Sequence, residues 1–292
     1  MVFGAGIAMT PSLVSSCVQE ANLRKITILH TNDTHSNIEP FPSNHTKFPN
    51  RGGVARRFEL INQIRSKEKN VLLVDAGDIF QGTPYFNKFG GTLELKLMSQ
   101  LGYDVATMGN HDFDAGLNGF KNALKHADFP FVCSNYDFSK TELNGLTHPY
   151  TVFQKNEVKV GVFGLGIELA GLVPSSCYGE TQYNDPISVA NSIAKILKKD
   201  KKCDLVIALS HLGHFSRLNN MSDPILAKET SNIDLIIGGH THTFLQEPEV
   251  HLNKEGNKVL INQVGWGGLA LGRIDFFFED SSSSNSYQIE MI

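Results

Sequence analysis

The sequence predicts an α/β fold. Short apolar runs that are typical of buried strands recur along the chain, and amphipathic stretches with helical periodicity stand between them. Strands that alternate with helices in this way usually form a mainly parallel sheet with helices packed on it. The chain has 292 residues, of which 41% are hydrophobic, so it is long enough to bury the core that such a fold requires.

The elements can be assigned in order. The predicted strands are apolar almost throughout, so we expect both of their faces to be buried, and they are Lys25–His30, Val71–Val74, Val105–Met108, Val158–Phe163, Leu205–Leu209 and Ile233–Ile237. The predicted helices are Val54–Lys67, Leu93–Leu101, Leu117–His126, Pro186–Asp200 and Ile225–Thr230. Lys258–Glu279 lacks a long helix and predicts two further strands around Gly265–Gly268, which we expect to close the sheet as antiparallel pieces.

The two ends of the chain differ from the rest. Val2–Ser16 is apolar, small and uncharged, which is typical of a secretion signal, and Val14–Cys17 resembles a bacterial lipobox, in which the cysteine is lipidated. No basic residue precedes this run, so a tail without a targeting role is the alternative. We expect residues 1–24 to be signal and tether, with export to the periplasm or to the outer membrane of a bacterium and a lipid anchor at Cys17. Residues 281–292 are polar and predict a frayed tail, which leaves 25–280 as one folded domain.

Composition excludes several classes of protein. The formal net charge is -4, so nothing indicates a surface that neutralises a nucleic-acid polymer. No stretch approaches the roughly 20 apolar residues of a transmembrane helix. The four cysteines contain no CxxC pair, which excludes a zinc ribbon or a thioredoxin-type motif. Cys133 and Cys203 border strand-like runs, where buried, unreactive thiols are the usual case.

Polar clusters follow five of the predicted strands directly: Thr31–His35, Asp75–Asp78, Gly109–Asp114, Ser210–His214 and Gly238–His242. Ligands of open α/β sheets bind beyond the carboxyl ends of the strands, so we expect the clusters to converge. Asp33 and His35 are two residues apart in an extended segment and share one side, which suits a metal. A single Asp or His at a strand end is more often a hydrogen-bonded structural group. Five such clusters, each directly after a predicted strand, favour a shared site.

These motifs resemble those of a known family. ITILHTNDTHSNI and YDVATMGNHDFD are similar to the two strongest motifs of the calcineurin-like metallophosphoesterases, and specifically of the N-terminal domain of the 5′-nucleotidase family. The resemblance covers about Lys25–Glu279 and implies a four-layer α/β/β/α sandwich with two metals at its edge. Asp112 stands where that family more often has Glu, at a position outside the implied metal and catalytic sets.

The resemblance implies the ligands and the chemistry. One metal would be bound by Asp33, His35, Asp78 and His242, and the other by Asp78, Asn110, His211 and His240. The mixed nitrogen and oxygen ligands suit Zn, Mn or Fe. Two such cations can hold a bridging hydroxide that attacks phosphorus in line. Asn110 and His111 would contact the substrate, and His111, oriented by Asp114, would protonate the leaving oxygen. His30, His214 and Asp75 are expected nearby without such a role.

The function that the resemblance implies is hydrolysis of a phosphate ester, and a nucleotide is the favoured substrate. A broad phosphodiesterase, a 2′,3′-cyclic nucleotide hydrolase or a UDP-sugar hydrolase is the alternative, and an inactive ligand-binding surface lipoprotein is a remote one. Two-domain 5′-nucleotidases use a C-terminal domain with arginines and stacked aromatic rings to bind the nucleoside. We expect this domain to be absent here, so that a separate partner chain supplies it or the substrate is smaller or less discriminated.

Overall fold

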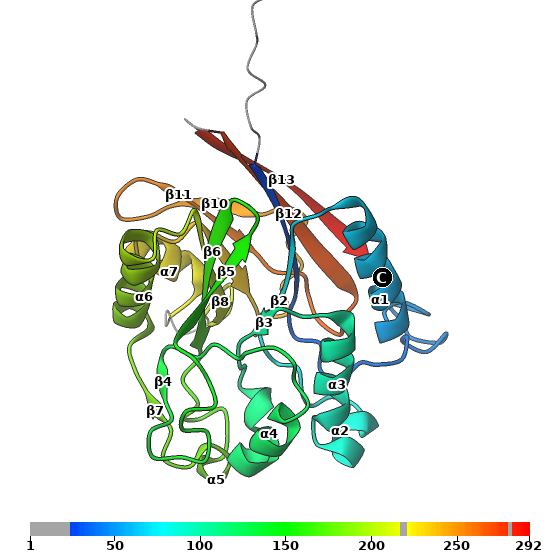
Figure 1. The fold of residues 1–292 in the computed structure, drawn as a ribbon. Helices are drawn as coiled ribbons and strands as arrows, with labels where there is room; N and C mark the ends of the chain where they lie inside the picture. The colour runs from blue at the N-terminus through cyan, green and yellow to red at the C-terminus, as the bar shows by residue number, and fades with distance from the viewer. Residues whose placement is uncertain (1–23, 217–220, 280–281) are drawn as a thin grey trace, which may run out of the picture.

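The computed structural model describes residues 24–216, 221–279 and 282–292, and it confirms the predicted α/β architecture (Figure 1). The expected signal segment lies outside the described residues except for Arg24, so the lipobox at Cys17 is not part of the structure. Within the described ranges no helix is both long enough and apolar enough to cross a bilayer.

The first sheet has the strand order β13-β12-β1-β2-β3, with the bounds Ser282–Met291, Ala270–Glu279, Arg24–Thr31, Val71–Asp75 and Val105–Ala106. β1, β2 and β3 are parallel to one another, whereas β12 is antiparallel to both β1 and β13. Of the two strands expected in Lys258–Glu279, β12 therefore closes this sheet as an antiparallel piece. The other, at Lys258–Asn262, lies in the second sheet, where it is parallel to one neighbour and antiparallel to the other.

The second sheet has the order β10-β11-β9-β8-β6-β5, with the bounds Glu249–Leu252, Lys258–Asn262, Leu235–Gly238, Leu205–His211, Val158–Gly166 and Tyr150–Lys155. Its central strands β6, β8 and β9 are parallel. A small ribbon joins β4 to β7, at Tyr136–Asp137 and Gln182–Tyr183.

The helices have the bounds Val54–Lys67 (α1), Pro84–Phe89 (α2), Thr92–Leu101 (α3), Gly116–Leu124 (α4), Ser175–Tyr178 (α5), Pro186–Lys195 (α6) and Asp223–Glu229 (α7). His111–Phe113 forms a 3-10 turn, and a π-helical turn at Ile196–Asp200 continues α6. α6 begins where the Asp185 side chain accepts a hydrogen bond from the amide of Ser188, with Pro186 at the first helical position, so its start is capped and preorganised.

Three apolar cores separate four layers. Leu205, Ile207 and Leu209 of β8 point into the core between the two sheets, which Ile26 and Ile28 of β1 enter from the other side. The alternate residues of each strand point outward: Leu29 packs with residues of α1, α3 and α4, and Val206 packs with residues of α6 and α7. Both faces of both sheets are therefore covered, which confirms the expected α/β/β/α sandwich (Figure 1).

The predicted polar tail at 281–292 is wrong as a description of the chain end, because Ser282–Met291 forms β13. This strand pairs with β12 along its whole length, from Ser282 opposite Glu279 to Met291 opposite Ala270. Tyr287 and Met291 remain exposed, so backbone hydrogen bonds rather than buried side chains stabilise the strand. At its end Ile292 is buried and its carbonyl accepts a hydrogen bond from the amide of Gly52.

Candidate metal centre

The polar clusters lie where the parallel strands of both sheets end. β1 ends at Thr31, β2 at Asp75 and β3 at Ala106 in the first sheet, while β8 ends at His211 and β9 at Gly238 in the second. The loops that follow carry the residues predicted to form the site, and the structure brings them together at one edge of the sandwich.

The backbone of these loops is unusual. Non-glycine residues rarely adopt a positive φ, and when they do so at several neighbouring positions the surrounding structure must hold them there. Five of the seven predicted metal ligands have this conformation, with φ between 47° and 69°: Asp33, His35, Asp78, His240 and His242. Such concentrated backbone strain is typical of a functional site.

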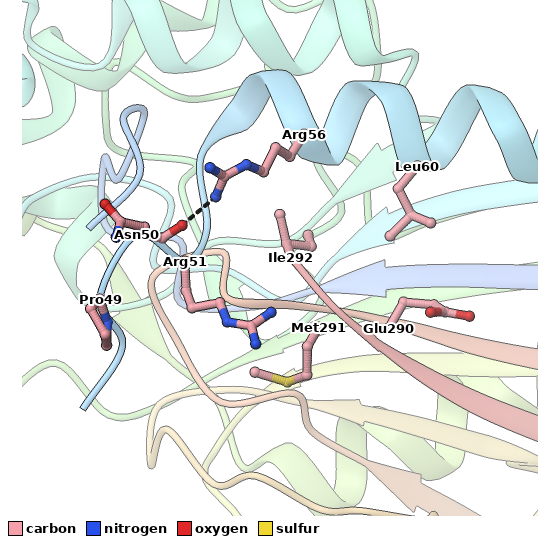
Figure 2. A pocket seen from close by; sticks show the side chains of 8 residues that line it. All are labelled: Pro49, Asn50, Arg51, Arg56, Leu60, Glu290, Met291 and Ile292. Atoms are coloured by element: carbon pink, nitrogen blue, oxygen red, sulfur yellow. Dashed lines mark hydrogen bonds between the residues drawn. The ribbon is translucent and has the colours of Figure 1, made fainter. Parts of the chain in front are cut away.

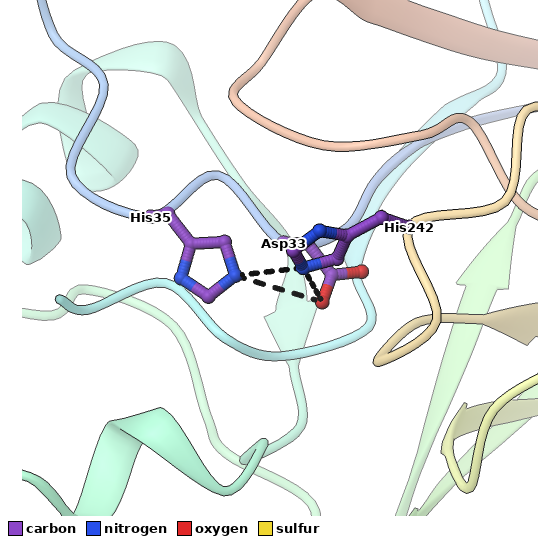
Figure 3. A group of neighbouring side chains, drawn as sticks. All are labelled: Asp33, His35 and His242. Carbon is purple, nitrogen blue, oxygen red and sulfur yellow. Dashed lines mark hydrogen bonds and ion pairs between the residues drawn. The ribbon is translucent and has the colours of Figure 1, made fainter. Parts of the chain in front are cut away.

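Asp33, His35 and His242 form the first group (Figure 3). The Nε2 atoms of His35 and His242 are 3.0 Å apart, and they lie 3.9 Å and 3.4 Å from Oδ1 of Asp33. Nδ1 of His35 is 3.2 Å from the carbonyl of Phe80, which only accepts, so Nδ1 carries the proton and Nε2 presents its lone pair. Burial lowers the pKa of His35 and keeps the ring neutral.

Asp78, His211 and His240 form the second group. Nδ1 of His211 donates to the carbonyl of Ala76 at 2.7 Å, and its Nε2 faces Oδ2 of Asp78 at 3.1 Å without a well-aligned hydrogen bond. Burial opposes a charge on His211, but the Asp78 carboxylate outweighs it and raises the pKa of His211 to about 10. The position therefore favours a positive charge, which a cation would supply in place of the proton.

Asp78 faces both groups. Its Oδ2 lies 3.1 Å from Nε2 of His211 and 3.7 Å from Nε2 of His35, while its Oδ1 accepts the backbone amide of His111 at 2.8 Å. Burial opposes the charge of this carboxylate, yet the surrounding imidazoles hold the pKa of Asp78 below its ordinary value. A carboxylate in this position is suited to bridge two cations.

Asn110 lies beside the second group. Its Oδ1 is 2.8 Å from Nδ1 of His240, so an amide oxygen and an imidazole nitrogen point into the same space. Burial, followed by the charge of His211, lowers the pKa of His240 to about 4, which leaves this ring neutral. Imidazole nitrogens, carboxylate oxygens and an amide oxygen that crowd together in this way are the donor set of a divalent metal centre.

His111 and Asp114 lie at the rim of this cluster. Nδ1 of His111 is 2.8 Å from Oδ2 of Asp114, and the His111 ring is 5.4 Å from the ring of His35 between centroids. The side chain of His111 is 37% exposed, whereas that of His211 is fully buried. Burial opposes a charge on His111, but Asp78 and Asp114 raise its pKa above the ordinary value. The pair thus places an imidazole that favours its protonated form beside the cluster.

Comparison with known proteins identifies the family of the chain. A family model described as calcineurin-like phosphoesterase matches residues 26–244. The chain belongs to this family. The two groups of metal-ligating side chains are therefore the candidate sites of the binuclear divalent metal centre that calcineurin-like phosphoesterases use.

Several relatives of this calcineurin-like phosphoesterase are nucleotide hydrolases by name. The chain is 34% identical to the trifunctional nucleotide phosphoesterase YfkN of Bacillus subtilis over 87% of this chain and 18% of that protein. It is 32% identical to the venom 5′-nucleotidase of Gloydius brevicauda over 89% of this chain and 46% of the venom enzyme. The solved structure of a 5′-nucleotidase precursor from Thermus thermophilus superimposes with a TM-score of 0.82 and 31% identity, covering 92% of this chain and 55% of that one. These matches confirm the resemblance to the metallophosphoesterase domain of 5′-nucleotidases, and the chain spans about half or less of the length of these relatives.

Asp112 is the residue of this phosphoesterase whose importance the sequence did not reveal. Its carboxylate is fully buried and accepts four backbone amides: those of Asp78 at 3.0 Å, Ile79 at 3.0 Å, Phe80 at 3.1 Å and Gly109 at 2.8 Å. It thereby joins the loop after β2 to the loop after β3. Its local sequence could indicate only the contact with Gly109, since an acidic side chain can accept an amide of its own turn, whereas the other three amides come from the distant loop after β2.

The neighbouring polar residues differ in their distance from the centre. Asp75 accepts the hydroxyl of Thr31 at 2.6 Å and the amide of Gly77 at 2.9 Å, so it shapes the loop that leads to Asp78. His30 is fully buried behind the site, 3.1 Å from the side-chain amide of Asn262, and contacts no predicted metal ligand in the described residues. His214 pairs with Glu249 at 3.3 Å instead of a ligand side chain.

A cavity of about 470 Å³ lies apart from this centre, between the start of α1 and the end of β13 (Figure 2). Arg51, Glu290 and Met291 contribute to its walls, and Arg56 donates a hydrogen bond to the carbonyl of Asn50 beside it. It shares no lining residue with the two ligand groups. The candidate metal centre of this phosphoesterase and this cavity are therefore separate places on the molecule.

Proposed function

We propose that the chain hydrolyses phosphate esters of nucleotides at a binuclear divalent metal centre. The observation that carries this proposal is the His111–Asp114 hydrogen bond of 2.8 Å at the rim of two groups of metal-ligating side chains. A protein that only binds a metal or a phosphate needs no proton donor beside them. The 5′-nucleotidases and the nucleotide phosphoesterase among its relatives support a nucleotide as the substrate.

Each residue of the two groups has a part in holding the cations. Asp33, His35 and His242 would hold one cation together with Asp78, and Asp78 would hold the second with Asn110, His211 and His240. The carbonyls of Phe80 and Ala76 keep the protons of His35 and His211 on Nδ1, so Nε2 is free to bind. When bound, the two cations supply a nucleophilic water at neutral pH and neutralise the charge of the phosphate.

His111 would donate a proton to the leaving oxygen of the ester. Its Nδ1 is engaged by Asp114, so Nε2 is the atom that can reach the substrate. Asp114 fixes the orientation of the ring and stabilises its cationic form, which is the form that donates. The backbone amide of His111 is bonded to Asp78, so the donor is also held at a constant position relative to the bridging carboxylate. Asn110 precedes it and would contact both cation and substrate.

A broader substrate range is the second candidate. The relative named as a trifunctional nucleotide phosphoesterase favours activity on more than one class of ester. The further classes that we propose for this chain are 2′,3′-cyclic nucleotides, other phosphodiesters and UDP-sugars. The same centre serves both ester classes, because the acid and the cations act on the phosphoryl group and its leaving oxygen alone. Only the surface around the centre distinguishes them.

The proposal is tested by initial rates on AMP, a 2′,3′-cyclic nucleotide, UDP-glucose and bis-p-nitrophenyl phosphate with added Mn²⁺ or Zn²⁺. We expect metal-dependent turnover that falls by about two to four orders of magnitude in His111→Ala. The preferred substrate decides between the two candidates. No turnover of any of these esters by the metal-loaded chain would contradict both.

Export is a separate proposal. The uncharged run Val2–Ser16 before Cys17 supports a signal with a lipid anchor, and the relative named as a 5′-nucleotidase precursor is consistent with processing. Mass spectrometry of membrane fractions tests it: we expect a chain that begins at a lipidated Cys17, and an unmodified start at Met1 in the soluble fraction would contradict it.

A further inference from the structure

Five aromatic rings lie beside the metal centre: Phe41, His45, Phe48, Phe244 and Trp266. We call this group the aromatic array. All five side chains are half-buried, and none belongs to the three apolar cores of the described residues. The array comes from the loop before α1, the loop between β9 and β10 and the loop between β11 and β12, so segments far apart in the sequence build it. A half-exposed aromatic surface of this kind requires an explanation other than core packing.

The array begins at a metal-ligating residue. The Trp266 ring stacks on that of His242, with 5.8 Å between centroids and 15° between planes. Phe41 meets Trp266 nearly at a right angle at 5.4 Å, and His45 lies 4.8 Å beyond Phe41. Phe48 contacts both His45, at 5.8 Å, and Phe244, at 6.1 Å. The rings therefore form one continuous surface that leads outward from the candidate centre.

Hydrogen bonds fix the array relative to the centre. The residues on either side of Trp266 are bonded to the loop of the first ligand group, because the side-chain amide of Asn32 donates to the carbonyl of Gly265 at 2.6 Å and the amide of Gly267 donates to the carbonyl of Asp33 at 2.7 Å. A Cβ atom at Gly265 would lie 2.1 Å from the Phe244 ring, and one at Gly267 would lie 2.9 Å from the Phe41 ring. Glycine is therefore needed for the close approach of the rings.

The chemistry of the array favours a planar apolar group. A phosphate at the centre leaves the rest of the ester to extend over the adjoining surface. Phenylalanine and tryptophan rings offer a sugar few hydrogen-bond partners and offer a second phosphate no charge. They do offer stacking and edge contacts to any planar ring, which is why aromatic side chains bind nucleobases with little regard to their identity.

We propose that the aromatic array is a substrate-binding surface that contacts the planar aromatic ring of the ester, a nucleobase in the case of a nucleotide. This inference rests on the proposed phosphoesterase function and assigns part of its specificity to residues of this chain. The array acts on binding, so it lowers KM for substrates that carry a ring and leaves substrates without one unaffected.

Fluorescence tests ring binding without any reaction. Trp266 is the single tryptophan of the sequence, so its emission reports on the array directly. Adenosine, which has the ring but no phosphate, should quench this emission saturably, and ribose should not. Phe41→Ala and Phe48→Ala should weaken adenosine binding by about 5- to 50-fold. Phe277→Ala is the matched control, because this half-buried ring lies opposite Lys25 at the far end of β1. Absence of saturable quenching at millimolar adenosine would overturn the inference.

Kinetics separate the array from the catalytic centre. We expect Phe41→Ala and Phe48→Ala to raise KM for AMP by about 5- to 50-fold and to change KM for glycerol phosphate less than twofold. Equal losses on both esters would overturn the inference, since the array would then only position His242. If an alanine variant does not fold, Phe41→Leu keeps the apolar packing and removes the aromatic face. If the chain hydrolyses glycerol phosphate but does not bind adenosine, the substrate-binding role of the array is refuted and the proposed function stands. If adenosine quenches the emission of Trp266 but no ester is hydrolysed, the proposed function is refuted and ring binding by the array stands.

Discussion

The carboxylate of Asp112 accepts a hydrogen bond of 3.0 Å from the backbone amide of Asp78. The same carboxylate accepts three further backbone amides. Together these hydrogen bonds hold the turn that contains His111 against the loop that contains Asp78, the carboxylate that faces both ligand groups. His111, the proposed proton donor, and Asp78, a proposed metal ligand, are thus parts of one hydrogen-bonded unit, and this unit depends on Asp112, which belongs to neither proposed set.

Replacement of Asp112 by Asn should therefore damage stability and activity together. An amide group would present N–H to backbone N–H, so about half of the four hydrogen bonds would be lost and buried donors left unpaired. We expect the free energy of unfolding to fall by about 2–4 kcal/mol, measured by urea denaturation, and kcat/KM to fall with it. Asp137→Asn is the control, because this half-buried carboxylate accepts the backbone amide of Ser139, and an asparagine oxygen can still accept that amide. An Asp112→Asn variant that matches wild type in both measurements would show that the unit is not needed.

The proposed role of His111 as proton donor is tested by comparing substrates with different leaving groups. p-Nitrophenolate departs readily without protonation, whereas the alkoxide of a nucleoside does not. We expect His111→Ala to reduce kcat for AMP by about 10²- to 10⁴-fold and kcat for p-nitrophenyl phosphate by much less. Asp114→Asn should show the same pattern in weaker form. Equal losses on both substrates in His111→Ala would mean that His111 binds the phosphate without acting as an acid.

The substitution Gly109→Ala tests how closely the side chains of the candidate metal centre pack. A Cβ atom at this position would lie 2.2 Å from Oδ1 of Asp78 and 2.6 Å from the His211 ring, and Gly109 has no positive φ, so the cost of a side chain there is steric alone. Gly109→Ala should weaken Mn²⁺ or Zn²⁺ binding by more than tenfold in calorimetric titration. Gly145→Ala is the control, because its Cβ atom would meet open space at a positive φ and should cost only about 1 kcal/mol of stability. Unchanged metal affinity in Gly109→Ala would contradict the packing seen here.

His30 predicts a pH dependence of stability. Burial lowers the pKa of His30 to about 3, against an ordinary value of 6.5 that applies in the unfolded chain. The unfolded state therefore binds a proton that the folded state refuses, and stability is lost as the pH falls below about 6.5. This residue alone should cost about 2 kcal/mol between pH 7 and pH 5. His30→Gln should be less stable at pH 7 but should show a shallower decline in urea denaturation, and parallel declines would refute the assignment.

The helices, the strands and the polar clusters that follow the strands could be predicted from the sequence, because each depends on a pattern of residues that are neighbours in the chain. Val54–Lys67 was predicted with the bounds that α1 has, since its apolar stripe is continuous and Gly53 precedes it. β13 was missed because Ser282–Met291 gains its stability from backbone pairing with β12, which a serine-rich pattern does not reveal. The four amide contacts of Asp112 and the joining of Trp266 to Phe41 depend on loops from distant segments, so no local pattern could show them.

The central claim is that two groups of side chains hold two divalent cations. Its most direct test is metal analysis of the purified chain after reconstitution with Mn²⁺ or Zn²⁺, with hydrolysis followed in parallel. We predict two cations per chain in the wild type, one tightly bound cation in His242→Ala, and little activity in that variant. One cation or none in the wild type, with hydrolysis that does not respond to metal, would contradict the account.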